Sequence, residues 1–148
     1  MNQSVLMAAA FGTGVLVPLQ LAFNAQLGQV TKNAYTASLI VFLIGAAVLA
    51  LVVLATRPAL PSPAELAGAP KTVWLGGVIA TIYILAVVWV TPRLGVAETA
   101  VLIIAGQLLM AVALDHFGAF NMPQIPITWL RALGACLVVA GVLAIRKG

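Results

Sequence analysis

The sequence predicts an all-α integral membrane protein with five transmembrane helices. The chain has 148 residues, of which 64% are hydrophobic and only 7% are charged. A soluble protein usually carries about 25% charged residues, so this chain cannot cover a water-exposed surface. Five apolar stretches are each long enough to cross about 30 Å of hydrocarbon at about 1.5 Å per residue. This composition excludes a cytosolic enzyme, a disordered tail and a disulfide scaffold.

The five predicted spans cover residues 4–27, 34–55, 73–91, 96–114 and 129–145, and we treat 1–148 as a single transmembrane domain. The first span resembles a signal peptide in position. However, it has no Lys or Arg before it, and its apolar run exceeds the roughly 7–15 residues of a signal sequence. We therefore interpret it as a retained helix.

The connections between the spans carry turn and capping residues. Asn33 is placed to cap the second helix. The connection 56–72 contains four prolines, and within it Ser62 and Glu65 have the spacing of a capping box around one short helical turn. Residues 92–95, Pro-Arg-Leu-Gly, predict a tight turn that makes the third and fourth helices antiparallel.

The distribution of positive charges favours neither orientation of the chain in the membrane. Five spans place Lys32, Arg93, Arg146 and Lys147 on one side of the membrane and Arg57, Lys71, Arg131 and the amino terminus on the other. The positive-inside rule needs an excess on one side, and there is none. This balance predicts an antiparallel homodimer in the lipid bilayer; a heterodimer with a similar chain and a single fixed orientation are the alternatives. The basic residues are scattered, which argues against binding to nucleic acid.

The first helix carries the most unusual residues for a membrane span. Pro18 cannot donate a hydrogen bond to the carbonyl of Gly14, so a kink is expected there. Beyond the kink, Gln20 and Asn24 are four residues apart and share one face. These two amides either pair with another helix or line a substrate path.

Three further polar residues fall within or at the edge of the spans. Tyr83 lies at the middle of the third span and Gln107 near the middle of the fourth, where each needs a hydrogen-bond partner or a ligand. Glu98 lies in the first turn of the fourth span, where the helix dipole favours a carboxylate. The functional alternative is a carboxylate that binds a proton or a cation at the mouth of a cavity.

Asp115 lies at the unfavourable end of the helix dipole, and Arg131 is its expected compensating partner. A proton relay through Asp115 and His116 is the functional alternative. Cys136 has no second cysteine. The sequence offers no catalytic motif, no metal-ligand spacing and no cofactor motif, so we expect neither an enzyme nor a bound cofactor.

Several short motifs resemble, in order and spacing, the YdcZ-type proteins of the drug/metabolite transporter superfamily. They are Pro18-Leu19-Gln20 with Asn24 and Leu27-Gly28, Trp74-Leu75-Gly76-Gly77, Pro92-Arg93-Leu94-Gly95, Gly106-Gln107-Leu108, Leu114-Asp115-His116-Phe117-Gly118, and Arg131-Ala132-Leu133-Gly134 with Gly141-Val142. The resemblance covers nearly the whole chain. It implies a multi-pass protein of the bacterial inner membrane that is half of a ten-helix architecture built from two inverted five-helix halves.

The resemblance also shapes the expected mechanism. Four-helix relatives use a glutamate in the middle of the first helix for proton-coupled export, whereas this chain has Gln20 and Asn24 there and no acid. Glu98 is then the candidate for coupling. We expect a small secondary transporter that exports small organic or amphiphilic solutes by alternating access. The alternative is a membrane scaffold or accessory subunit that transports nothing.

Overall fold

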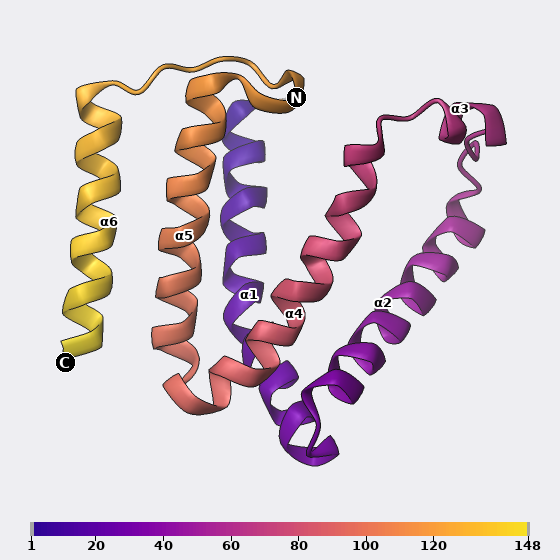
Figure 1. Cartoon of the computed structure of the whole chain (residues 1–148), viewed down its shortest axis with the longest axis horizontal. Helices are drawn as coiled ribbons and strands as arrows, with labels where there is room; N and C mark the ends of the chain where they lie inside the picture. Colours follow the sequence, from indigo (N-terminus) through magenta and orange to yellow (C-terminus); the bar gives the residue numbers. More distant parts are fainter. Residues whose placement is uncertain (1, 148) are drawn as a thin grey trace. The chain divides into compact units, whose positions relative to one another are not determined.

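The computed structural model describes residues 2–147, and its architecture is helical. Five long helices are α1 (Gln3–Thr31), α2 (Ala34–Thr56), α4 (Leu75–Leu94), α5 (Val96–Phe117) and α6 (Trp129–Lys147) (Figure 1). Short helical turns occupy the connections: α3 (Pro63–Ala67), η1 (Lys71–Trp74) and η2 (Ala119–Asn121). Within residues 2–147, five helical segments are long and apolar enough to cross a membrane. The predicted fold class is confirmed.

The helices extend beyond the predicted spans at several ends, because polar residues can continue a helix past the hydrocarbon. The prediction was wrong at residues 92–95. Pro92 lies inside α4, the helix continues to Leu94, and Gly95 alone joins it to α5. Gly95 has φ = 87°, a left-handed value that glycine adopts without the steric cost of a side chain. One glycine therefore forms the whole connection between α4 and α5.

The predicted caps are confirmed. Asn33 Oδ1 accepts from the backbone N–H of Tyr35 at 2.8 Å and of Thr36 at 3.1 Å. Ser62 and Glu65 form both halves of a capping box. The backbone N–H and the hydroxyl of Ser62 donate to the Glu65 carboxylate, and these hydrogen bonds hold the pKa of Glu65 below its usual range.

The helices form two compact units. The middle unit comprises Gln20–Arg93, and the terminal unit comprises the residues up to Leu19 together with those from Leu94 onward. The division passes through α1 and α4, and each crossing lies one residue after a proline, Pro18 or Pro92. Each of these prolines removes one backbone hydrogen bond from its helix.

The core of the middle unit lies among the second half of α1, the first half of α2 and the second half of α4. Its core consists of Ala37 on α2 with Ile84 and Val88 on α4, and the partly buried residues Leu27, Ala34, Val41, Phe42 and Tyr83 pack against it. A Cβ built on Gly28 would lie only 2.6 Å from Val88 Cγ1, so α1 and α4 touch backbone to side chain there. Toward α3, α2 and α4 separate (Figure 1), and α2 is exposed from Leu43 onward.

The terminal unit contains α5 and α6, which run side by side (Figure 1). Thr99, Ala100 and Val142 are its buried residues. The Thr99 hydroxyl donates to the Gly95 carbonyl at 2.7 Å, so it is satisfied within its own helix.

Candidate substrate path

Three buried polar side chains of the middle unit have no hydrogen-bond partner in the described part of the chain. Asn24 is 6% exposed, Ser38 is 3% exposed and Thr91 is 2% exposed. The atoms without a partner are Asn24 Nδ2, Ser38 Oγ and Thr91 Oγ1. A buried polar group without a partner costs about 1–3 kcal/mol, and nearly all buried polar atoms in proteins are satisfied. Each of these three atoms is therefore free to form a hydrogen bond with another group.

The three residues lie on the three helices that build the core of the middle unit. Ser38 directly follows the core residue Ala37 on α2. Thr91 lies one helical turn after Val88 on α4, and Asn24 lies one turn before Gly28, whose Cα faces Val88. Their uncharged donors and acceptors suit a neutral polar ligand.

The structure divides the residues predicted for the substrate path. Asn24 is buried, whereas Gln20 on the same helix is exposed. Tyr83 is half-buried and packs against the core of the middle unit. Glu98 and Gln107 belong to the terminal unit, and Gln107 is exposed. The five residues therefore do not form one set within either unit.

Sequence reasoning missed Ser38 and Thr91. A serine or threonine in a helix commonly donates to the carbonyl one turn earlier, as Thr13, Thr56 and Thr81 do here. The same assumption made Ser38 and Thr91 unremarkable in the sequence. Only the tertiary packing shows that both are buried and unpartnered.

Glu98 is held by a residue that the sequence did not indicate. Arg146 Nε lies 3.4 Å from Glu98 Oε1. The Glu98 side chain is 27% exposed and that of Arg146 is 66% exposed, so water reaches the pair. Glu98 and Arg146 therefore form a partly exposed ion pair.

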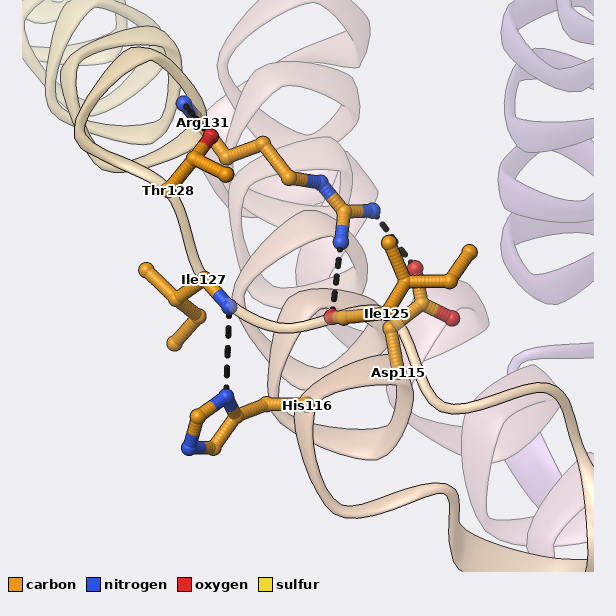
Figure 2. Close-up of polar contacts among 6 residues, drawn as sticks. All are labelled: Asp115, His116, Ile125, Ile127, Thr128 and Arg131. Carbon is orange, nitrogen blue, oxygen red and sulfur yellow. Dashed lines mark hydrogen bonds and ion pairs between the residues drawn. The ribbon is translucent and has the colours of Figure 1, made fainter.

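The structure brings Asp115 and Arg131 together, as expected from the helix dipole. Arg131 Nη2 lies 2.6 Å from Asp115 Oδ2, and Arg131 Nη1 donates to the Ile125 carbonyl at 3.1 Å (Figure 2). The Ile125 N–H in turn donates to the Asp115 carbonyl at 2.8 Å. One guanidinium therefore ties the end of α5, the following loop and the start of α6.

His116 fastens the same loop. Its Nδ1 accepts from the Ile127 N–H at 3.2 Å (Figure 2), and its carbonyl accepts from Gln124 Nε2 at 3.0 Å. An imidazole nitrogen that accepts a backbone N–H carries no proton. These contacts give His116 a structural role in the loop.

Replacing Arg131 with glutamine is expected to lower the free energy of unfolding by about 1–2 kcal/mol, because it breaks the ion pair and the bond to the loop. Both side chains are about one-third exposed, which keeps the loss below that of a fully buried pair. Thermal unfolding of the purified protein in detergent measures the change. Arg146→Gln is the control and should cost less, since its pair is longer and more exposed. Equal losses in the two variants would contradict this role for Arg131.

All three acids of the chain are engaged: Glu65 by Ser62, Glu98 by Arg146 and Asp115 by Arg131. Among residues 2–147, no three His, Cys, Asp or Glu side chains are grouped so that they could hold a metal ion.

A family model described as "Putative inner membrane exporter, YdcZ" matches residues 5–144. The match covers α2, α4 and α5 in full and all but the outermost residues of α1 and α6. Neither the curated proteins nor the solved structures contain a match to this sequence.

Proposed function

The chain belongs to the YdcZ family of inner-membrane exporters, within the drug/metabolite transporter superfamily, and we propose that it moves a small, uncharged, polar organic solute by alternating access. It is a membrane protein of a transporter family and not of an enzyme family. The solute binds in the middle unit, where Asn24, Ser38 and Thr91 supply its hydrogen bonds.

The observation that carries this proposal is the set of three unpartnered polar atoms. Asn24 Nδ2 is a donor, and the two hydroxyls can donate or accept. Within lipid these groups gain no hydrogen bonds from the surroundings, so a solute that satisfies them recovers the cost of burying them. A charged solute would need a charged partner, and none of the three residues is charged.

Alternating access needs parts that can move against each other. The two units are joined through α1 and α4 just after Pro18 and Pro92. A proline inside a helix removes a backbone hydrogen bond and is a common cause of bending. When two bodies move, a few residues at a hinge absorb the change in backbone angles. The positions just after Pro18 in α1 and just after Pro92 in α4 are therefore suited to act as hinges.

A screen for bound solutes tests the proposal directly. The purified protein is mixed with a panel of small organic compounds, and its melting temperature is measured for each. We expect a neutral polar compound to raise it and to be taken up by proteoliposomes that contain the protein. If compounds that stabilise the protein are never transported, the proposal that it is a transporter is wrong. A scaffold or accessory subunit would give that result.

Glu98→Gln is expected to abolish the pH dependence of that transport, because an amide cannot take up a proton or hold Arg146 through an ion pair. The initial rate of uptake is compared between two external pH values, with wild type and the variant in the same lipids. We expect wild type to change severalfold over the pH gradient and the variant to change little. An unaltered pH response in the variant would reject Glu98 as the coupling group.

We further propose that the working unit is an antiparallel dimer. The balanced positive charges support it. So does the exposed part of α2 from Leu43 onward. A Cβ built on Gly45, Gly76 or Gly77 would meet nothing within 4 Å, so these glycines leave open surface for another helix. Small residues allow close helix contact in membranes. Reporter fusions at the carboxyl terminus should be active on both sides of the membrane; activity on one side alone would exclude dual insertion.

A further inference from the structure

Two adjoining grooves lie in the middle unit, where the α1–α2 turn meets the last turns of α4. One has a volume of about 580 Å³ and the other of about 280 Å³. They share Lys32, Asn33, Ala34 and Trp89. Arg93 adds a second cation to the smaller groove. This pair of grooves, termed the basic groove below, is separate from the three buried polar groups.

The two cations of the basic groove have no acidic partner in residues 2–147. The ion pairs of the described chain use Arg131 and Arg146. The middle unit contains a single acid, Glu65, and its carboxylate accepts from Ser62 at the other end of α2. Lys32 and Arg93 therefore present an uncompensated positive charge that attracts an anion.

The guanidinium of Arg93 has a fixed position in the basic groove. Its Cζ lies 4.4 Å from the centroid of the Trp89 ring, a cation–π arrangement. One of its amino groups also donates to the Trp89 carbonyl. The remaining N–H groups of the fork can bind oxygens of a phosphate, which arginine recognises well.

The basic groove lies where the headgroups of a bilayer begin. Lys32 directly follows α1 and Arg93 is in the last turn of α4, at the ends of two membrane-spanning segments. Trp89 and the exposed Tyr35 are the amphipathic aromatic residues that occupy this depth. Toward the hydrocarbon, the grooves are lined by Leu85, Ala86 and Val88. The lining therefore changes along α4 from basic Arg93 through aromatic Trp89 to apolar Leu85.

We propose that the basic groove binds the phosphodiester headgroup of an anionic phospholipid, with Lys32 and Arg93 on the phosphate and the start of an acyl chain against Leu85 and Ala86. Basic pockets between helices at this depth are suited to lipid headgroups. A soluble phosphate ester offers the same anionic group without the acyl chain, so the apolar part of the lining favours the lipid.

Quenching of Trp89 fluorescence by brominated lipids tests the proposal. The background variant Trp74→Phe with Trp129→Phe leaves Trp89 as the one tryptophan of the chain. It is reconstituted in vesicles that contain equal fractions of brominated phosphatidylglycerol or brominated phosphatidylcholine. We expect stronger quenching by the anionic lipid. Lys32→Gln and Arg93→Gln should each reduce the relative affinity for phosphatidylglycerol about fivefold, since one basic residue near the surface contributes about that factor.

Controls separate the site from general charge and from misfolding. Lys71→Gln removes an equal charge elsewhere in the middle unit and should leave the lipid preference intact. Arg93→Lys keeps the charge and should retain most of the preference that Arg93→Gln loses. The proposal is overturned if the two lipids quench equally, or if the preference survives in the double variant Lys32→Gln/Arg93→Gln. If 10 mM glycerol 3-phosphate (about the concentration needed for a weak site) removes the preference, the groove takes a soluble ester and the lipid assignment is rejected.

Discussion

Replacing Asn24 with leucine is expected to make the protein more stable and unable to transport. The Asn24 amide nitrogen is buried without a partner, and an apolar side chain of similar size removes that penalty. The gain in the free energy of unfolding should be about 1–2 kcal/mol. Transport should fall about tenfold or more, because a hydrogen bond worth about 1.4 kcal/mol corresponds to a tenfold change in affinity. Thermal unfolding and uptake into proteoliposomes, with the solute found in the screen, measure the two effects.

Gln26→Leu is the matched control for this experiment. It also exchanges an amide for leucine on α1, two residues further along, but Gln26 is exposed. It should change neither transport nor stability by much. A purely structural role for Asn24 predicts instead that Asn24→Leu lowers stability, or that it leaves transport at the level of Gln26→Leu.

Replacing Gly28 with alanine is expected to have the largest effect on stability. The new Cβ would lie 2.6 Å from Val88 Cγ1, closer than two carbon atoms can approach. Val88 is β-branched and has one strongly preferred rotamer in a helix, so it cannot turn away and the helices must shift. Overpacking of this kind costs about 1–3 kcal/mol, and thermal unfolding in detergent measures it.

Gly12→Ala isolates that contact from the intrinsic effect of alanine. A Cβ at Gly12 meets nothing within 4 Å, so this variant should gain up to about 1 kcal/mol from helix propensity alone. Val88→Ala should rescue Gly28→Ala, because it removes the atom that collides. Additive effects of the two substitutions in a double-mutant cycle would show that α1 and α4 do not touch at this point.

The local features of this protein could be predicted from its sequence because neighbouring residues determine them. Asn33 caps α2 by accepting from the N–H groups of Tyr35 and Thr36, two and three residues further along the chain. Ser62 and Glu65 are three residues apart and satisfy each other. Asp115 and Arg131 are further apart, but the dipole of α5 and the position of Arg131 at the start of the next helix, on the same side of the membrane, were enough to indicate the pair. At Pro92 the same reasoning was wrong, because a proline does not always end a helix when a glycine follows to turn the chain.

The candidate site could be predicted only in part, because it depends on which helices meet. Asn24 was predicted to be a site residue because an amide within the hydrocarbon needs a hydrogen-bond partner or a ligand, and the structure shows it buried. Gln20 was predicted on the same argument, but the structure shows it exposed. Ser38 and Thr91 resemble many hydroxyl residues that bond to their own helix. Arg146, near the end of the chain, reaches Glu98 through the side-by-side packing of α5 and α6.

The sequence was sufficient to predict that this chain is a membrane protein with five transmembrane helices. The physical reason is that each segment must satisfy its own backbone hydrogen bonds and must carry few charges to enter lipid. The length and composition of a single segment therefore determine whether it spans the membrane. Only the tertiary structure shows that Asn24, Ser38 and Thr91 are buried without hydrogen-bond partners and that Lys32 and Arg93 line the same groove. Those properties depend on contacts between helices, and nearly uniform apolar faces contain little information about which residues will meet.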